Sequence, residues 1–152
     1  MKSVADPRVL ESLVERLEAL TPQSQRRFGT LTPHEMLCHL GDATSHVLGE
    51  RLVDPPSRER RRPLMKWIAL SLPLPWPKGF KTRRAVDPRL DGTKPSEFKA
   101  DLDRAVDGLR RVAAANGKDL IPLHPVFGTM TLEDWHRWAC RHTEHHLKQF
   151  GL

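Results

Sequence analysis

The feature that most constrains the fold of this chain is a helical stripe near its C-terminal end, in which histidines continue a row of apolar side chains. Five side chains recur there at steps of three and four residues: Leu132, Trp135, Ala139, His142 and His146. Because successive residues of an α-helix are about 100° apart, all five lie on one face. Such a face is stable only when it is covered, so the segment predicts a packed helix whose inner face carries two histidines one turn apart.

The start of this helix is marked by its capping residues. Thr131 followed by Asp134 is a variant of the capping box, in which a hydroxyl and a carboxylate each accept a hydrogen bond from a backbone N–H. Met130 and Trp135 stand where a hydrophobic staple would stand. The helix is therefore predicted to begin at this point.

Two earlier segments show the same periodicity together with start signals. A first helix is predicted from Asp6, a cap residue followed by proline, to about Leu20. A second opens with the full capping box of Thr32 and Glu35 and ends at Gly49. These are two further amphipathic helices.

A third amphipathic segment follows a long irregular stretch. Pro95 and Ser96 are expected to open this helix, and Gly117 is expected to end it in the left-handed conformation. Residues 50–94, which precede it, are rich in proline and basic residues and contain one short helical candidate, the sequence LMKWIALSL. With no convincing strand, the chain predicts an all-α four-helix bundle with a long, basic excursion between the second and third helices.

Size and composition are compatible with one bundle. The chain has 152 residues, of which 38% are hydrophobic and 29% charged, so we expect one folded domain over 1–152 and exclude wholesale disorder. The most apolar stretch, Trp67 to Trp76, is too short to cross a bilayer, and no secretory signal precedes Asp6. Cys38 and Cys140 form no CxxC motif. We therefore expect a soluble cytoplasmic protein with reduced thiols and no membrane partner.

The basic charge is concentrated in the middle of the chain. Residues 51–99 hold thirteen Lys and Arg against five Asp and Glu, an excess of eight, whereas the whole chain has a net charge of +6. Solvated arginines are the commoner explanation, but attraction of carboxylate or phosphate groups is a second. Nucleic-acid binding through Arg58–Arg62 and Arg83–Arg84, with Trp67 or Trp76 stacking on bases, ranks last because no recognised motif accompanies the charge.

The histidines point to a metal site. His142 and His146 are neighbours on adjacent turns, and His39 stands midway along the apolar face of the second helix. If these two helices face one another, three neutral imidazoles can hold a divalent ion and leave one position open for water, as in catalytic zinc sites. Imidazole also suits nickel and ferrous iron, so the metal stays undetermined. A chance pairing of histidines is the alternative, and His46 is the substitute ligand if His39 is wrong.

Two signatures in the chain resemble a known family. LTPHEMLCHLGDA and HPVFGTMTLEDWHRWACRHTEHHLKQFG are similar to the DinB/YfiT-like superfamily, and in particular to its branch ending in HPxFG and HxxHHLxQFG. The resemblance implies a four-helix bundle, often a homodimer, with a divalent metal held by one histidine of the second helix and an HxxxH of the last. The matching positions are His39, His142 and His146.

The resemblance implies less about the reaction. Relatives include metal-dependent transferases that use low-molecular-weight thiols, a maleylpyruvate isomerase and proteins with no known activity. We expect a metal-dependent transferase or hydrolase acting on a small molecule, with a low-molecular-weight thiol as the candidate cosubstrate. The alternative is a non-catalytic metal-binding or assembly module.

The remaining histidines and the nearby acids have separate expected roles. His145 is the candidate proton shuttle, although a surface position fits it equally well, and Asp42 or Glu144 could orient an imidazole. If the fourth position is closed, the suspects are His46, Asp42 and Cys38. His124 is expected to pack at the mouth of the bundle. His34 and His136 are expected to point away from it.

Overall fold

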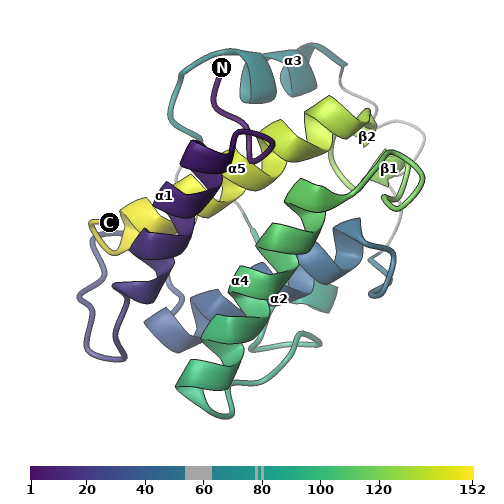
Figure 1. The fold of residues 1–152 in the computed structure, drawn as a ribbon. Helices are drawn as coiled ribbons and strands as arrows, with labels where there is room; N and C mark the ends of the chain where they lie inside the picture. The colour runs from purple at the N-terminus through teal and green to yellow at the C-terminus, as the bar shows by residue number, and fades with distance from the viewer. Residues whose placement is uncertain (54–62, 78, 80) are drawn as a thin grey trace.

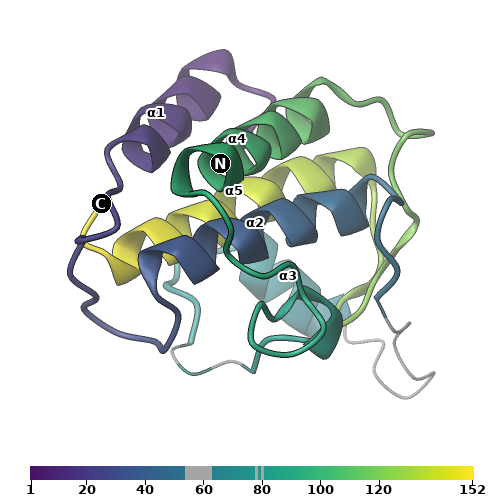
Figure 2. The same cartoon turned by 90° about the horizontal axis from the view of Figure 1, so that it is seen from below.

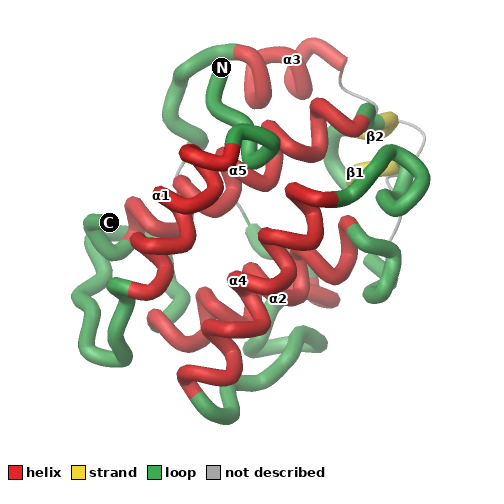
Figure 3. The backbone as a smooth tube through the Cα atoms, viewed as in Figure 1, coloured by secondary structure: helices red, strands yellow, loops and turns green. Residues whose placement is uncertain are grey.

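The computed structural model describes residues 1–53, 63–77, 79 and 81–152. Its regular elements are α1 (Pro7–Glu18), α2 (Pro33–Val47), α3 (Pro63–Ser71), the 3-10 helix η2 (Arg84–Val86), α4 (Phe98–Ala114), β1 (Leu123–His124), β2 (Gly128–Thr129) and α5 (Leu132–Gln149). Helices dominate the described residues (Figure 3). The predicted all-α fold is confirmed.

Four helices make up the bundle, and they contact one another in the cyclic order α1, α4, α2, α5. Figure 1 and Figure 2 show these helices alongside one another, with α3 outside them. The short helix α3 belongs to the predicted excursion and packs on α5. The histidine-bearing helices α2 and α5 are therefore neighbours, which is the arrangement that a shared site requires.

The capping residues act as expected at both of these helices. Thr32 accepts a hydrogen bond from the Glu35 N–H, and the Glu35 carboxylate accepts one from the Thr32 N–H. Thr131 and Asp134 form the same reciprocal pair at the start of α5. Because the first backbone N–H groups of a helix lack intrahelical partners, these pairs define where α2 and α5 begin.

The core lies between the four helices. Its largest fully buried side chain is Trp135, whose indole N–H donates to the Ile121 carbonyl at 2.8 Å. The Ile121 N–H in turn donates to the Val47 carbonyl at 3.0 Å. These two hydrogen bonds join the loop before α5 to the end of α2, and so they help to fix the position of α5 relative to α2.

Two details of the third predicted helix are wrong. It begins at Phe98 after Glu97, whose carboxylate accepts from the Lys99 and Ala100 N–H groups, whereas Ser96 uses its own N–H to bond Asp101. Its end at Ala115 is extended backbone, and Gly117 is absent from the described residues with positive φ. A carboxylate displaced the hydroxyl as the cap, and an extended exit needed no left-handed glycine.

The loop between α4 and α5 contains the only strand pairing in the described part of the chain. Leu123 pairs with Thr129 and His124 with Gly128 in antiparallel register, and Gly128 has a φ of 76° that favours glycine. No helix within the described ranges has the length and apolar character that a bilayer crossing requires.

Candidate metal centre

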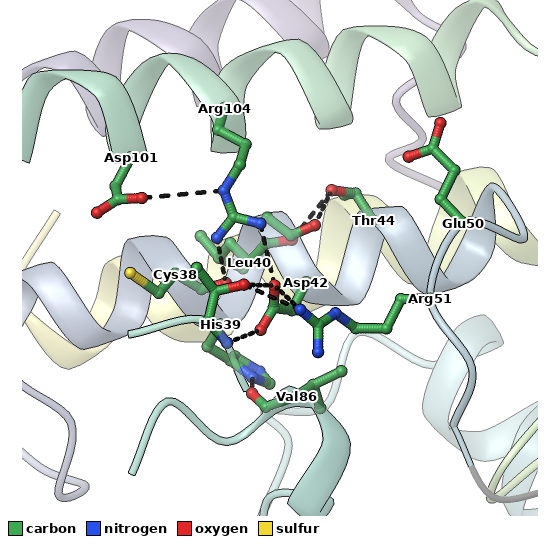
Figure 4. Close-up of polar contacts among 12 residues, drawn as sticks. Cys38, His39, Leu40, Asp42, Thr44, Glu50, Arg51, Val86, Asp101 and Arg104 are labelled. Atoms are coloured by element: carbon green, nitrogen blue, oxygen red, sulfur yellow. Dashed lines mark hydrogen bonds and ion pairs between the residues drawn. The ribbon is translucent and has the colours of Figure 1, made fainter. Parts of the chain in front are cut away.

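His39 is placed by the middle of α2 and is almost completely buried. Its Nδ1 lies 2.8 Å from the carbonyl oxygen of Val86, in the 3-10 helix η2 (Figure 4). Since a carbonyl oxygen only accepts, the proton sits on Nδ1 and the Nε2 atom carries a lone pair. This lone pair is directed away from η2, toward α5.

His142 and His146 approach the same point from α5. The Nε2 atom of His142 lies 3.1 Å from Nε2 of His39 and 3.2 Å from Nε2 of His146. On the far side of the His146 ring, Nδ1 lies 2.9 Å from Oε1 of Gln149, three residues later on the helix. With the amide oxygen as acceptor, His146 also carries its proton on Nδ1 and a lone pair on Nε2.

The protonation of the three rings has a direct consequence. The Nε2 atoms of His39 and His146 each carry a lone pair and no proton. The Nε2 atom of His142 can carry one proton, and it can donate that proton to only one of the other two rings. At least one pair of nitrogens then meets without a hydrogen between them, unless a cation lies among them. Three converging lone pairs are the donor set that a divalent ion takes from histidine.

The spacing of the nitrogens also fits an ion. Zinc–nitrogen bonds of about 2.0–2.1 Å at tetrahedral angles separate two nitrogens by about 3.3 Å. The slightly longer bonds and right angles of octahedral nickel or iron give about 3.1 Å. The observed 3.1 and 3.2 Å suit both geometries, so these three histidines form a group that could hold a metal ion.

Burial keeps these imidazoles neutral. It is the largest influence on all three rings and lowers the pKa of His39, while it lowers the pKa of His142 and His146 well below the ordinary value of 6.5. Neighbouring histidines lower the pKa of His142 and His146 further, whereas the hydrogen bonds to Val86 and Gln149 act in the opposite direction. A neutral ring is the form that binds a metal.

Aromatic side chains wall the cluster. Trp138 stacks on His142 with ring centroids 4.6 Å apart, and the Trp76 ring lies 6.2 Å from the same imidazole. Trp76 comes from the proline-rich excursion, which Arg141 of α5 ties down by donating to the Leu72 carbonyl at 2.7 Å. The excursion therefore contributes part of the wall around the site.

His145 lies next to this wall and is half-buried. Its ring is 6.1 Å from Trp76, 5.7 Å from Phe28 and 5.4 Å from His146, measured between centroids. Burial, followed by the charge of Lys148, lowers the pKa of His145. Its role in catalysis stays a prediction.

The alternative ligands are engaged elsewhere. His46 directs Nδ1 at the Arg51 carbonyl 3.0 Å away, and its Nε2 is buried without a partner in the described residues. Asp42 is fully buried, and both its oxygens accept hydrogen bonds from Thr93. Burial, followed by the charge of Asp101, raises the pKa of the Cys38 thiol to about 12. None of these three joins the imidazole group.

A second cluster consists of His34, Cys38 and Asp101, whose donor atoms lie within 4.8 Å of one another. Its groups already satisfy one another. Asp101 Oδ2 lies 2.8 Å from His34 Nε2 and accepts the Ser96 N–H at 3.1 Å. Although burial acts to raise it, the pKa of Asp101 is lowered because these bonds stabilise the carboxylate. The cluster joins α2 to α4 as a hydrogen-bonded group.

His136 lies outside the imidazole cluster, as expected, whereas the sequence analysis passed over Gln149. His136 is buried, with Nε2 directed at the Val112 carbonyl 3.1 Å away, because α1 and α4 cover its side of α5. Gln149 could have been found, since a residue three positions after a histidine on a helix is its neighbour. His124 is buried and stacks on Phe127, in agreement with its expected packing role.

The basic residues of the excursion are largely paired where the structure describes them. Arg84 forms an ion pair with Asp91, and Arg89 forms one with Glu35. Arg83 donates to the Pro125 carbonyl at 3.0 Å. The run Arg58–Arg62, on which the nucleic-acid hypothesis depended, lies outside the described residues.

Comparison with known proteins adds the family. No curated protein and no solved structure matches the chain. A family model described as the DinB superfamily matches residues 4–150, which include every helix and all three histidines of the cluster. The match covers almost the whole chain and agrees with the signatures that flank His39 and His142. The chain therefore belongs to the DinB superfamily.

Proposed function

We propose that this protein is a cytoplasmic, divalent-metal-dependent enzyme in which His39, His142 and His146 hold the ion through their Nε2 atoms. One observation carries the proposal: the three Nε2 atoms converge, while Val86 and Gln149 hold the protons of His39 and His146 on the opposite nitrogens. A divalent ion in such a site acts as a Lewis acid and lowers the pKa of a coordinated water or thiol.

The proposed reaction is transfer to, or hydrolysis of, a small molecule, with a low-molecular-weight thiol as the cosubstrate of the transferase. Its support is the number of ligands. Three histidines supply three donors, and His46, Asp42 and Cys38 all bond elsewhere. A position therefore stays available for a ligand from solution, as in catalytic rather than structural sites.

The chain's own residues would shape that position. Trp138 and Trp76 present apolar ring faces beside His142, so they exclude water and favour an apolar part of the substrate. We assign His145 the role of proton acceptor, because it is half-buried beside His146 and its lowered pKa leaves it neutral at neutral pH. Its Nδ1 or Nε2 would take the proton that a thiol or water loses.

Cobalt substitution tests the open position. In protein loaded with Co²⁺, a low-molecular-weight thiol is expected to change the visible d–d absorption and to add a sulfur-to-metal charge-transfer band, because its sulfur enters the coordination sphere. His145→Gln keeps all three ligands and should show the same spectral change, but should lose turnover in a thiol-transfer and hydrolysis screen. His39→Ala is the control for the metal site itself.

An unresponsive cobalt spectrum would contradict a catalytic role. A cobalt spectrum unaffected by thiols, azide and other small anions would mean that a fourth protein ligand closes the site. The protein would then be a non-catalytic metal-binding module. If the spectrum responds to thiols but no substrate class is turned over, the open position is supported and the substrate lies outside the classes screened.

We also propose that the protein forms a homodimer through α3. Leu64, Trp67 and Ile68 lie on one face of this helix at spacings of three and four, and Trp67 is 54% exposed. An exposed apolar stripe of this kind is typical of interaction surfaces.

Light scattering coupled to size exclusion should give twice the mass of the 17.4 kDa chain, and Trp67→Glu should give the monomer. Leu90→Glu, at an exposed leucine on another segment, is the matched control; a monomeric wild type would contradict the proposal.

A further inference from the structure

The carboxylate of Asp42 lies one helical turn after His39 and is completely buried. Among the described residues it forms no hydrogen bond or ion pair with the imidazole cluster; its partners come from three other parts of the chain. Thr93 approaches with its backbone N–H at 2.7 Å and its hydroxyl at 2.6 Å. Arg104 of α4 and Arg51, just after α2, form ion pairs with it at 3.0 and 3.2 Å (Figure 4).

Arg51 extends this network to the backbone that holds His39. One of its nitrogens, Nη2, donates to the Thr93 hydroxyl at 2.9 Å, and the other, Nη1, donates to the Ala85 carbonyl at 2.8 Å. Ala85 immediately precedes Val86, whose carbonyl accepts the Nδ1–H of His39. Asp42 and Arg51 therefore hold residues at both ends of the segment 85–93.

The segment between these two anchors is closed on itself. The Gly92 and Leu90 N–H groups both donate to the Asp87 carbonyl, at 2.8 and 2.9 Å. The Asp91 N–H donates to the backbone carbonyl of Arg84. A Cβ atom on Gly92 would lie 2.6 Å from the Asp87 backbone, so the turn is tightly closed. A compact turn transmits the position of its anchors to Val86 better than a flexible loop would.

We propose that Asp42 is a positioning residue of the metal centre: it fixes the segment 85–93, and through the Val86 carbonyl it sets the tautomer and ring orientation of His39. This inference rests on the proposed function, because it names what prepares one of the three ligands. It also explains why a fully buried carboxylate has two half-buried arginine partners beside a histidine with which none of them forms a hydrogen bond. Outer hydrogen-bond partners of metal-binding histidines commonly change metal affinity 10- to 100-fold.

Asp42→Asn is the informative substitution. An amide has one oxygen, so it can accept either from the Thr93 N–H or from the hydroxyl and the arginines, but not from both sides as the carboxylate does. The segment 85–93 should loosen, and zinc affinity, measured by competition with a chromophoric chelator, is expected to fall about 10- to 100-fold. Thr93→Val, which removes only the hydroxyl, is a milder second variant should Asp42→Asn fail to fold.

Two controls separate positioning from a loss of stability. Asp91 lies in the segment 85–93 and forms an exposed ion pair with Arg84. Asp91→Asn removes this ion pair and should leave zinc affinity unchanged. Val112→Ala, a core truncation in α4, lowers stability without touching the segment and should also leave affinity unchanged.

A second readout does not depend on the metal. Long-range ¹H–¹⁵N correlation of the histidine rings in metal-free protein should show one tautomer for His39, protonated at Nδ1, in the wild type and in both controls. In Asp42→Asn or Thr93→Val the His39 signal should move toward a mixture of tautomers. If the wild type binds no zinc, the proposed function fails, yet this measurement still decides the role of Asp42. An unchanged tautomer together with unchanged affinity in both variants would overturn the inference.

Discussion

Replacing His142 and His146 together by alanine is expected to lower the bound metal from about one divalent ion per chain to none. The two rings provide two of the three converging Nε2 atoms, at 3.1 and 3.2 Å separations. One remaining imidazole, that of His39, cannot hold an ion against buffer and chelator. Elemental analysis after reconstitution with zinc, nickel or ferrous iron and removal of free metal measures the effect.

The matched control is His136→Ala. This residue lies on the same helix and is as buried as His146, but it bonds the Val112 carbonyl and stands outside the cluster. The control should bind metal like the wild type, although it loses stability. If the double variant kept the wild-type stoichiometry, the ion would be bound elsewhere and the proposed function would fail.

The second large effect is a loss of stability of the metal-free protein as the pH falls below about 6.5. Burial is the main reason that the pKa of His124 drops from its ordinary value of 6.5 to about 3, and His46 and Arg83 lower it further. Below pH 6.5 the unfolded chain therefore binds a proton at this ring that the folded chain does not. Each such imidazole lowers the free energy of unfolding by about 1.4 kcal/mol per pH unit within that window.

Other histidines add to this dependence. His39 and His146 are at least as buried as His124, and burial lowers their pKa in the same direction. Each of them that stays neutral in the folded chain therefore adds up to about 1.4 kcal/mol per pH unit to the slope. A domain of ordinary stability, about 5–15 kcal/mol, should then unfold in mildly acidic buffer. Urea denaturation at a series of pH values between neutrality and pH 4 measures the slope.

His124→Asn isolates one ring of the set. The Nδ1 atom of His124 accepts from the Val126 and Phe127 N–H groups at 3.0 and 3.1 Å, and an asparagine oxygen can take the same place without titrating. This variant should flatten the slope by about 1.4 kcal/mol per pH unit. A slope equal to that of the wild type would show that His124 does not stay neutral in the folded chain.

Much of the fold followed from local signals. The capping boxes of Thr32 and Thr131 mark the starts of α2 and α5, and the apolar stripes mark the faces that meet in the core. These features were readable because they depend on residues within one or two turns of each other. The same is true of His142 and His146, whose common face is a matter of helical spacing alone.

Local signals did not predict the burial or the partners of a side chain where another segment of the chain packs over it. His136 was expected only to point away from the site, but the covering by α1 and α4 also buries it. Asp42 was a candidate for orienting an imidazole, but its burial and its ion pairs with Arg51 and Arg104 could not be read from its own helix. A side chain's burial depends on which elements pack over it, and helical periodicity does not contain that information.

The sequence by itself determined the helices, the family resemblance and the three histidines whose spacing and faces allow a common site. Only the tertiary structure decided that their Nε2 atoms converge and which partners hold their protons. The reason is distance along the chain: His39 lies 103 residues from His142, and its partner Val86 is 47 residues away. Contacts of that separation arise from the packing of α2 on α5 and of the excursion on α2, which no local pattern specifies.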